Sequence, residues 1–526
     1  MAFDYFDIFS PVVTGKEMAR IDRYTIENIG IPGIVLMENA GRAVAARIKQ
    51  MLGDLRSKKV VVVCGKGNNG GDGYVVARYL LESDATVDTY LVGKANDVKG
   101  DAATNLLILK NLGHKVHEVS RLEHISIDAG AHLVVDALLG TGVRGPLAGL
   151  LSDIVAKMGE VRAPILSVDI PTGVQSDTGL VDGACIKAQA TVTMALPKRG
   201  LLFSPGREQC GDVAEVDIGI PKFAVKANDV KCFRLNDDGI RRVLPERATN
   251  AFKNRCGQVF LLAGSQGLTG AAVLSAEAVL RIGAGMALLG IPKSLNGILE
   301  EKLTEVMTVP LAETELGCLS LEAKGAVAEK LPWSDVLAVG PGLSTHADVA
   351  TLLKWLVTGY DKPMVLDADA INCFSGEATL LEETKAALVL TPHPGELARL
   401  IGIDVKTILA EPIEVAREWA KRLNVVLVLK GAPTVVGSAD GSVFINSTGN
   451  AGMATAGMGD VLTGVIAGLI AQGMTPLDAA LAGVYIHGFA GDIASSRMGE
   501  RGLISRDVLE SLPFALKNLQ VHDIQN

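Results

Sequence analysis

The sequence lacks the features of a membrane protein and the commonest hydrolase motifs. Its longest charge-free runs, such as residues 256–276, contain Gln, Ser, Thr and several Gly, whereas a spanning helix needs about 20 mostly apolar residues. The motifs H-E-x-x-H, G-x-S-x-G and G-x-x-x-x-G-K-[ST] are absent. These absences exclude the simplest interpretations as a zinc protease, an α/β-hydrolase or a P-loop NTPase.

An excess of positive charge and a disulfide pattern are also missing. Lys and Arg number 50 against 59 Asp and Glu, for a net charge of −9, so we expect no general affinity for nucleic acid. Seven Cys without a C-x-x-C pair favour reduced thiols. The acidic residues of MAFDYFDIFSPVVTGKE do not fit a basic targeting segment. We therefore expect a cytoplasmic protein with small-molecule partners and no nucleic-acid or membrane partner; its oligomeric state stays open, and a homo-oligomer is allowed.

At 526 residues the chain is too long for one compact core. Helical spacing covers residues 14–56, and helices are also expected at 73–83 and 100–112. Between them lie short apolar strand candidates at 59–64, 86–92, 132–136, 164–169 and 191–196. Strands that alternate with helices predict a parallel sheet covered on both faces. We expect 217–221 to be its last strand and the charged, turn-rich residues 222–250 to be a linker.

A second α/β series follows, with strand candidates at 258–265, 287–292, 336–342, 363–370, 388–396 and 425–431 and helices at 270–285 and 457–472. The expected fold class is therefore α/β, with two doubly wound domains. We place them at residues 1–225 and 226–526 and expect each to fold and act alone.

A glycine-rich loop follows the first of these strands. In VVVVCGKGNNGGDG, residues 60–73, Gly65, Gly67 and Gly70 form G-x-G-x-x-G between a strand and a helix. Such a loop lets backbone N–H groups approach a phosphate, although a tight turn without a ligand would also use these glycines. The three polar residues in the loop, Asn68, Asn69 and Asp72, favour a binding site. Asp88 stands near the position that binds ribose in ordinary dinucleotide folds.

Two more strand ends carry carboxylates. Asp136 ends HLVVD, and Asp169 ends PILSVD and precedes Thr172. Carboxyl ends of parallel strands share one edge of a sheet, so Asn69, Asp136, Asp169 and Thr172 should converge on one crevice. Either Asp alone could instead cap the next helix.

The stretches NNGGDG, DALLGTGVRGP and VDIPTG, in this order, resemble the NAD(P)H-hydrate epimerases over roughly residues 10–220. The resemblance implies a Rossmann-like domain with Asp169 as a catalytic residue that binds the hydrated nucleotide near the reacting carbon. It implies K⁺ ligands at Asn69, Asp136 and Thr172, of which Thr172 stands where many relatives have Ser. It also implies substrate binding by Asn68, Asn69, Gly70, Gly71, Asp72, Gly140, Thr141, Gly142, Val143, Arg144, Gly145 and Pro146.

The second half contains NSTGNAGMATAGMGDVLTG at 446–464. Small residues lead directly into a helix whose N–H groups can face an anion, and Asp460 lies in its first turn. An Asp there also suits a helix with no catalytic role. KGAPT at 430–434 follows a strand and offers Lys430 to a nucleotide. HPGE at 393–396 supplies His393, which could be purely structural, and Glu396, which could hold Mg²⁺ through water.

The Gly-x-Gly-Asp arrangement resembles the ribokinase-like superfamily, where the Asp accepts a proton from the substrate hydroxyl. Within it, GSQGLTGA, GPG, TPHPGE, KGAPT and GNAGMATAGMGD are similar to the ADP-dependent NAD(P)H-hydrate dehydratases over about 240–515. Phe252 and Ser344 depart from the family's usual His and Gly. The resemblance implies catalysis by Asp460 and substrate contacts from Gly342, His393 and Asp460. It implies ADP contacts from Lys430, Gly431, Ala432, Pro433, Thr434, Gly449, Asn450, Ala451, Gly452, Met453, Ala454, Thr455, Ala456, Gly457, Met458 and Gly459.

Together the two resemblances imply a repair enzyme for NADH or NADPH that has taken up water at a ring double bond, with the hydroxyl at C6. One half would interconvert the R and S hydrates. The other would phosphorylate the S hydroxyl from ADP, and elimination would give NAD(P)H, AMP and phosphate. Two alternatives stay open: a ribokinase-like vitamin or sugar kinase with a dehydrogenase-like domain, and a non-enzymatic binding module, since epimerase-like domains also occur as scaffolds.

Overall fold

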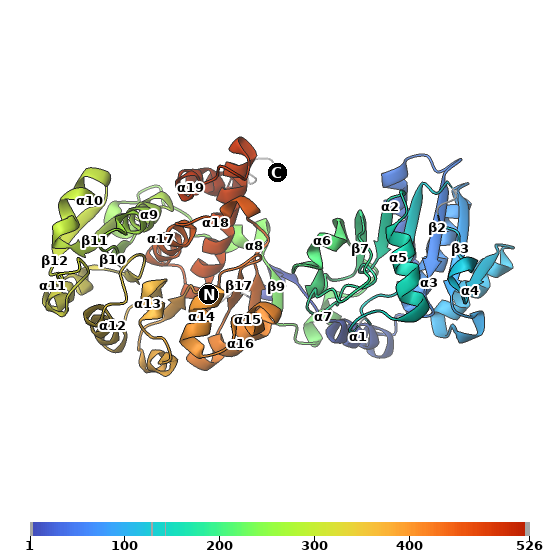
Figure 1. Ribbon diagram of the computed structural model, residues 1–526, viewed down its shortest axis with the longest axis horizontal. Coiled ribbons are helices and arrows are strands. Elements are labelled where there is room, and N and C mark those ends of the chain that lie inside the picture. Colours follow the sequence, from blue (N-terminus) through green and yellow to red (C-terminus); the bar gives the residue numbers. More distant parts are fainter. Residues whose placement is uncertain (1–3, 128–129, 143, 521–526) are drawn as a thin grey trace. The chain divides into compact units, whose positions relative to one another are not determined.

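The computed structural model describes residues 4–127, 130–142 and 144–520. The chain forms two compact units, one of Pro11–Val230 and one of Met1–Ser10 with Lys231–Asn526. Each contains a largely parallel sheet with helices packed against it (Figure 1). Among the described residues, no helix has the length and apolar character needed to cross a bilayer. The expected α/β class with two doubly wound sheets is confirmed.

The Pro11–Val230 unit is built on a seven-stranded sheet in the order β4-β3-β2-β5-β6-β7-β8, with every neighbouring pair parallel. Successive strands run outward in one direction from β2 and in the other from β5. A doubly wound sheet binds ligands at the carboxyl edge where the strand order reverses, here between β2 and β5. The strands are β2 (Lys59–Cys64), β3 (Thr86–Val92), β4 (Val116–Val119), β5 (Leu133–Ala137), β6 (Ile165–Val168), β7 (Ala190–Met194) and β8 (Asp212–Val216).

The helices of this unit depart from the expectation at both ends. The expected helical stretch 14–56 is three elements, α1 (Gly15–Tyr24), a π-helical turn η2 (Thr25–Ile29) and α2 (Gly33–Leu52), because Gly30 takes a left-handed conformation and Pro32 follows. The helix α3 (Asn68–Glu82) begins inside the glycine-rich loop, five residues earlier than 73. The other helices are α4 (Gly100–Asn111), α5 (Gly149–Gly159), α6 (Arg207–Cys210) and α7 (Lys222–Ala227).

The last strand of the first sheet was expected at 217–221 and lies instead at β8, so this prediction is wrong. Residues 212–216, DVAEV, form a partly exposed strand at the edge of the sheet. Its two acidic residues interrupt the continuous apolar run that marks a strand buried on both faces, so the sequence did not indicate this strand. Ile218 and its neighbours follow the strand as a loop.

The second unit has an eleven-stranded sheet in the order β1-β9-β18-β17-β16-β15-β14-β13-β10-β11-β12, in which only the β16-β17 and β17-β18 pairs are described as antiparallel. Its order reverses between β10 and β13, so the carboxyl ends of β10 and of β13 to β16 share one edge. The strands are β1 (Ser10–Pro11), β9 (Cys232–Arg234), β10 (Gln258–Leu262), β11 (Met286–Pro292), β12 (Met307–Leu311), β13 (Val336–Val339), β14 (Met364–Leu366), β15 (Leu388–Leu390), β16 (Val426–Leu429), β17 (Val435–Gly437) and β18 (Val443–Ile445).

Helices cover this sheet, and the two most buried are α17 (Met458–Ala471) and α18 (Pro476–Met498). α17 is apolar on nearly all sides and packs against α9 and α18, which explains why its periodicity is weak. The remaining helices are α8 (Asp237–Val243), α9 (Thr269–Arg281), α10 (Asn296–Lys302), α11 (Lys324–Lys330), α12 (Ala347–Gly359), α13 (Asp369–Asn372), α14 (Pro394–Ile401), α15 (Val405–Ala410), α16 (Pro412–Leu423) and α19 (Ser505–Gln520).

The segment 222–250 is not a free linker. It forms α7, β9 and α8, and β9 joins the eleven-stranded sheet beside β18. Its charged residues lie on exposed faces of these elements, while Phe233 and Ile240 are buried in the core. Composition alone could not separate a charged helix surface from a linker.

The start of the chain packs on the second unit, although the expected division placed it in the domain 1–225. Phe9 is buried among Phe233 and Phe444, and the Tyr5 hydroxyl donates to Asp478 at 2.9 Å. We call residues 4–10 the N-terminal strap. The unit that holds 231–526 is therefore closed by residues that precede the other unit in sequence.

Phe9→Ala is expected to destabilise the unit that contains Lys231–Asn526 by about 3 kcal/mol, because truncating a buried Phe removes its apolar contacts and leaves a cavity. The other unit should keep its stability. Denaturant unfolding of the full chain, with each transition followed by the loss of one unit's ligand binding, measures this. Phe252→Ala, at an exposed Phe of the same unit, is the matched control. If the unfolding transition of the Lys231–Asn526 unit were unchanged in Phe9→Ala, the N-terminal strap would contribute nothing to the stability of that unit. A fragment that starts at residue 231 would then be as stable as the intact unit.

Candidate functional sites

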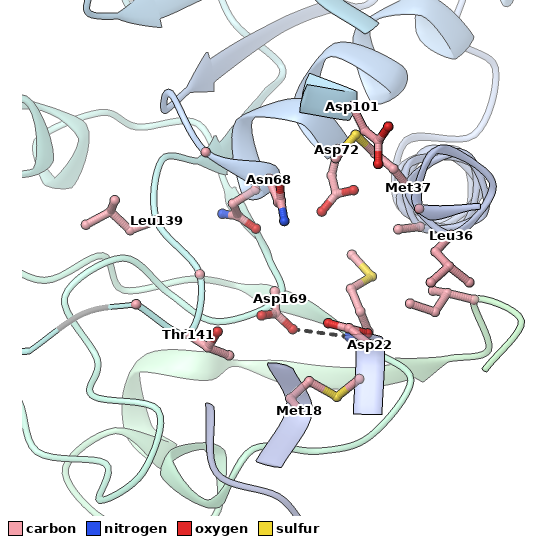
Figure 2. Close-up of a pocket in the computed structure, with 18 of the residues that line it drawn as sticks. Met18, Asp22, Leu36, Met37, Asn68, Asp72, Asp101, Leu139, Thr141 and Asp169 are labelled. Carbon is pink, nitrogen blue, oxygen red and sulfur yellow. Dashed lines mark hydrogen bonds between the residues drawn. The ribbon is translucent and has the colours of Figure 1, made fainter. Parts of the chain in front are cut away.

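In the Pro11–Val230 unit, a cavity of about 400 Å³ opens at the carboxyl edge between β2 and β5. Its walls come from α1, α2, the first turn of α3, the loop after β5 and the loops after β6 and β7 (Figure 2). The lining includes seven residues expected to bind the nucleotide, Asn68, Asn69, Asp72, Gly140, Thr141, Gly142 and Asp169. The residues that sequence reasoning missed include Met18, Asp22, Asp101 and Lys198.

Asp169 is held rigidly at the floor of this cavity. Its backbone is in the left-handed region, with φ +69°, and its Oδ1 accepts from Lys198 Nζ at 2.5 Å, Thr193 Oγ1 at 3.3 Å and Met194 N at 3.3 Å. A β carbon on Gly140 would lie 3.3 Å from Asp169 Oδ2, so this second oxygen faces the Gly140 loop. A non-Gly residue at positive φ is strained and points to a functional constraint.

Lys198 is a buried cation, with 1% of its side chain exposed. Besides Asp169, its ammonium donates to Met194 O at 2.9 Å and to Thr193 Oγ1 at 3.2 Å. All three of its protons are therefore used, and it serves as a fixed positive charge behind Asp169. Because Lys198 follows β7 in a loop with no motif among those the sequence analysis used, only the fold brings it to Asp169.

Asp136 and Thr172 lie together just behind the cavity wall. Asp136 is fully buried and accepts four hydrogen bonds, from Thr172 Oγ1 at 2.7 Å, Thr172 N at 2.9 Å, Ser167 Oγ at 2.9 Å and Leu138 N at 3.3 Å. Burial raises the pKa of Asp136, and these hydrogen bonds oppose the rise. No ion pair to Asp136 is present among residues 4–127, 130–142 and 144–520. Asn69, whose Nδ2 has no partner, is buried but not hydrogen-bonded to this pair.

Two further carboxyl groups face the cavity beside Asp169, those of Asp22 and Asp72 (Figure 2). Burial raises the pKa of Asp22 to about 6. Burial also raises the pKa of Asp72, and the negative charge of Asp169 adds to that rise. The positive charge of Lys198 opposes the rise in both groups. Three carboxyl groups thus share the charge of one buried lysine. Burial and mutual repulsion therefore favour the protonated forms of Asp22 and Asp72.

Several expected binding residues lie outside the cavity lining. Gly70 and Gly71 are buried in the first turn of α3, where a β carbon on Gly70 would be 2.0 Å from Gly65 O. Arg144, Gly145 and Pro146 follow on an outer loop. Val143 lies outside the described residues. Asp88 points away from the site and pairs with Lys59 at 2.9 Å in the middle of β3.

In the other unit, a second polar cluster lies where β14, β15 and β16 end. Its centre is Asp367, 1% exposed, which follows β14. Its Oδ1 accepts from Lys430 Nζ at 2.7 Å and Thr391 Oγ1 at 2.8 Å, and its Oδ2 accepts from Thr463 Oγ1 at 2.7 Å. Sequence analysis treated this segment as a strand only, and the LDADA stretch, with a carboxylate at a strand end, was the available signal.

Asp460 lies beside this cluster in the first turn of α17. A β carbon on Gly459 would be 3.2 Å from Lys430 Nζ and 3.7 Å from Asp367 Oδ2, so the start of α17 rests directly on both side chains. Burial raises the pKa of Asp460 to about 6, the charge of Asp367 adds to the rise, and Lys430 opposes it. Gly457, the N-cap, makes no side-chain cap, which leaves the first-turn N–H groups without a side-chain acceptor there.

Lys430 turns inward, although it was expected to face the nucleotide. Besides Asp367 it lies 3.7 Å from Glu396, and its side chain is 21% exposed. Of the remaining KGAPT residues, Thr434 donates to Gly431 O at 3.2 Å and so closes the turn. Ala432 and Pro433 are joined by a cis peptide bond within that turn.

His393 and Glu396 cap α14. The Glu396 Oε2 accepts from His393 N at 2.8 Å, while His393 Nδ1 accepts from Gly395 N at 3.0 Å and Glu396 N at 3.4 Å. This capping box is a purely structural role for His393, the alternative that the sequence left open. The Nε2 atom of His393 lies 3.4 Å from Glu396 Oε1, and 51% of the His393 side chain is exposed. No group of three His, Cys, Asp or Glu side chains suited to a metal occurs in the part of the chain that the structure describes.

The glycine-rich loop that precedes α17 is fastened by side chains outside it. Asp492 on α18 accepts from Gly449 N at 2.9 Å and Asn450 Nδ2 at 2.8 Å. The residues 451–453 form a short 3-10 turn, η11 (Ala451–Met453), and residues 454–457 connect it to α17. Behind the first turn of α17, His487 is buried and bonded to the Met458 backbone; burial lowers its pKa to about 4, and its Nε2 has no partner.

The end of β13 lies on the same edge. Gly342 has φ +61°, and Ser265 Oγ donates to its carbonyl at 2.8 Å. Ser344 has φ +77°, a left-handed conformation that Gly adopts without strain. Phe252, the other departure, is exposed and stacks with the Arg255 guanidinium at 5.0 Å.

Comparisons with known proteins agree with this two-site architecture. A family model described as NAD(P)H-hydrate dehydratase matches residues 259–513, and one described as YjeF-related protein N-terminus matches residues 33–200. The bifunctional NAD(P)H-hydrate repair enzyme of Moorella thermoacetica is 43% identical over 514 residues, 97% of each chain, and that of Salinibacter ruber is 38% identical over 520 residues, 96% of this chain and 95% of its own. A solved ADP/ATP-dependent NAD(P)H-hydrate dehydratase from Bacillus subtilis is 30% identical, with a TM-score of 0.49, over 54% of this chain and 98% of its own. The likeness to proteins that carry both units spans nearly the whole sequence.

Proposed function

Because the chain belongs to the family of bifunctional NAD(P)H-hydrate repair enzymes, we propose that its two sites divide the repair of hydrated NADH and NADPH between them. The cavity beside Asp169 interconverts the R and S hydrates. The cluster around Asp460 uses ADP to convert the S hydrate to NAD(P)H, with AMP and phosphate as products. The observation that carries the proposal is that each unit brings a carboxyl group close to a lysine at the carboxyl edge of its sheet. Asp169 is bonded to the buried Lys198, and the first turn of α17, which holds Asp460, rests on the partly buried Lys430.

In the epimerase unit, Asp169 is the acid–base group at the reacting carbon. Its Oδ1 is occupied by three donors, which leaves Oδ2 for the substrate. Asn68, Asn69 and Asp72 would bind the hydrated nucleotide at the start of α3, together with the adjoining loop of residues 140–142. Fixed orientation of this kind keeps a general base within reach of the proton it moves.

In the dehydratase unit, Asp460 accepts the proton of the C6 hydroxyl as that oxygen attacks the terminal phosphoryl group of ADP. The N–H groups of the first turn of α17 then face the transferred phosphoryl, as in other helix N-terminal anion sites. Residues of 449–459 and KGAPT would bind the rest of ADP, and Gly342 and His393 would contact the hydrate. Phosphate leaves readily where hydroxide would not, so elimination follows.

Lys430 has a wider role than nucleotide contact. Its ammonium lies between Asp367, Glu396 and the start of α17. There it offsets the repulsion between ADP phosphates and the surrounding carboxylates, and keeps Asp460 from being buried in uncompensated negative charge. Asp367, with Thr391 and Thr463, holds Lys430 in place.

We propose Mg²⁺ as a companion of the nucleotide. The residues described include no cluster of three metal-binding side chains, and Glu396 already accepts from the backbone and lies next to Lys430. A magnesium ion keeps several waters and is commonly bound through phosphates with one or two carboxylates. This chemistry fits a Mg²⁺ that arrives with the nucleotide and contacts Glu396 through water.

For K⁺ we propose Asn69, Asp136 and Thr172 as ligands, and their chemistry fits. Amide, carboxylate and hydroxyl oxygens suit a hard cation, and Asp136 is fully buried with no ion pair in the described part of the chain. The Thr172 hydroxyl donates to Asp136 and accepts from Leu139 N at 3.1 Å. The ion would supply the positive charge that Asp136 lacks.

If K⁺ binds at this site, it should stabilise the Pro11–Val230 unit, and Thr172→Val is expected to abolish that stabilisation because it removes a ligand. The substitution should also lower the free energy of unfolding of this unit by about 1–3 kcal/mol, because it removes a buried hydrogen-bond donor to Asp136. Thr172→Ser, which keeps the hydroxyl, is the matched control and should keep the response. Thermal unfolding in KCl against LiCl at equal ionic strength measures it. Equal K⁺ responses in the Val and Ser variants would contradict the assignment.

The seven cysteines are all free thiols, which supports a reducing compartment such as the cytoplasm.

The function itself is tested by incubating purified R and S hydrates of NADPH with the full chain. Interconversion of R and S without nucleotide, and recovery of NADPH with one AMP per turnover after ADP is added, would be the expected results. Phosphorylation of an unrelated alcohol, with neither result, would favour the kinase alternative.

A further inference from the structure

We propose that Asp22 is the second proton-transfer residue of the epimerase site and works together with Asp169 across the cavity. The proposal rests on the epimerase function proposed above. It assigns a catalytic role to a residue of α1, a helix that carries none of the sequence motifs of the site.

The position of Asp22 follows from helix geometry. Met18, Asp22 and Ile26 are spaced four residues apart and therefore lie on one face of α1 and its π-helical continuation. All three line the cavity. The start of α1 is fixed by a capping box, in which Thr14 Oγ1 accepts from Glu17 N and Glu17 Oε2 accepts from Thr14 N. Asp22 thus stands on a rigid wall and faces the floor where Asp169 lies (Figure 2).

No hydrogen bond from another residue of the described chain reaches the Asp22 carboxyl. The fold therefore gives this carboxyl no structural task, although half-buried carboxylates usually have one. Asp169 differs, because it is bonded to Lys198, Thr193 and Met194. One carboxyl is anchored and the other is free to exchange a proton with a bound molecule.

The charges around Asp22 come from four other parts of the unit. Asp169 and Lys198 face it from the loops after β6 and β7, and Asp72 faces it from α3; Asp101 on α4 also lines the cavity. The Lys198 ammonium donates to Asp169, Thr193 and Met194, so Asp169 is bonded directly to a cation and Asp22 is not. Burial raises the pKa of Asp22 to about 6, and the positive charge of Lys198 opposes this rise only in part. The cavity therefore holds one carboxyl group that is bonded to a cation, which suits a base, and one that is not bonded and has a raised pKa, which suits an acid.

Epimerisation needs this combination. The C6 carbon of the hydrate carries a hydroxyl and is bonded to the ring nitrogen N1. Asp169 Oδ2 removes the hydroxyl proton, the O–H electron pair becomes the C=O bond, and the C6–N1 bond breaks with its pair moving to N1, which takes the proton of Asp22. Rotation about C5–C6 turns the other face of the aldehyde toward N1. The reverse transfers then close the ring, and both protons return to where they began.

The test is the rate of R to S interconversion by the full chain with Asp22→Asn, without ADP. We expect kcat to fall on the order of 10²–10³-fold, as for removal of a general acid, while KM changes only a few-fold. In the wild-type protein the rate should fall as the pH rises above about 6, because Asp22 then loses its proton. The residual activity of the variant should lack this decline.

Asp88→Asn is the matched control, since Asp88 is a partly exposed, ion-paired carboxylate outside the cavity; it should retain full activity. ADP-dependent dehydration of the S hydrate should be unchanged in both variants. An unaltered kcat for Asp22→Asn, a loss confined to KM, or a pH decline that disappears in Asp72→Asn but persists in Asp22→Asn would overturn the proposal. If the wild-type chain did not interconvert R and S at all, the epimerase function itself would be the part that fails.

Discussion

Asp460→Asn is expected to abolish ADP-dependent recovery of NADPH, with a loss in kcat on the order of 10²–10⁴-fold, because an amide cannot take the hydroxyl proton. Binding of ADP should be little changed. The first-turn N–H groups of α17 and the loop fastened by Asp492 remain in place, and Asn at this position relieves a crowd of negative charge around Asp367.

Single-turnover formation of AMP, compared with the dissociation constant of ADP, separates chemistry from binding. Asp361→Asn, an exposed position of the same unit, is the control and should be fully active. If Asp460 acted only as a first-turn residue that favours the helix N-terminus, Asn would replace it at small cost. Normal turnover by Asp460→Asn would therefore rule out the proposed base.

The pH dependence follows from the same environment. A general base works when it is deprotonated, and the pKa of Asp460 is raised to about 6, by burial first and by Asp367 second. The dehydration rate should therefore rise with pH up to about 6 and level off above it. The rate of elimination from a pre-phosphorylated intermediate should not follow this profile.

Asp169→Asn is expected to reduce R to S interconversion on the order of 10²–10⁴-fold and to leave dehydration of the S hydrate intact. The amide keeps the shape of the carboxyl but leaves Lys198 buried without its counter-charge. Removal of one partner of a buried pair typically costs about 3–5 kcal/mol, so the stability of this unit should fall together with its activity.

These two effects are separated by Lys198→Met, which removes the cation and leaves the Asp169 carboxylate. It should destabilise the unit to a similar degree, yet keep more epimerase activity than Asp169→Asn at a temperature where both are folded. Asp153→Asn, exposed on α5, is the inert control. Equal loss of epimerase and dehydratase activity in Asp169→Asn would contradict a role confined to one site.

The candidate residues of both sites could be predicted from short contiguous stretches. Residues such as Asn69, Asp169 and Asp460 lie at strand ends or helix starts, where local sequence decides both the turn and the direction of the side chain. The alternation of apolar strands with helices predicted two doubly wound sheets for a related reason, since strands buried on both faces must be apolar throughout. The family motifs then identified the reactions.

The partners of these residues were decided only by the tertiary structure. Lys198 lies in the loop after β7 and Asp22 on α1, and no local pattern marks either residue, because a side chain that works through a distant contact leaves no periodic signal in its own segment. Asp367 stands at a strand end, but only the fold shows that it binds Lys430. The N-terminal strap is the clearest case: Phe9 precedes one unit in sequence but fills the core of the other. Local patterns determined which elements form and where the reactive groups stand, whereas the packing of those elements determined their charge, their protonation and the boundary between the units.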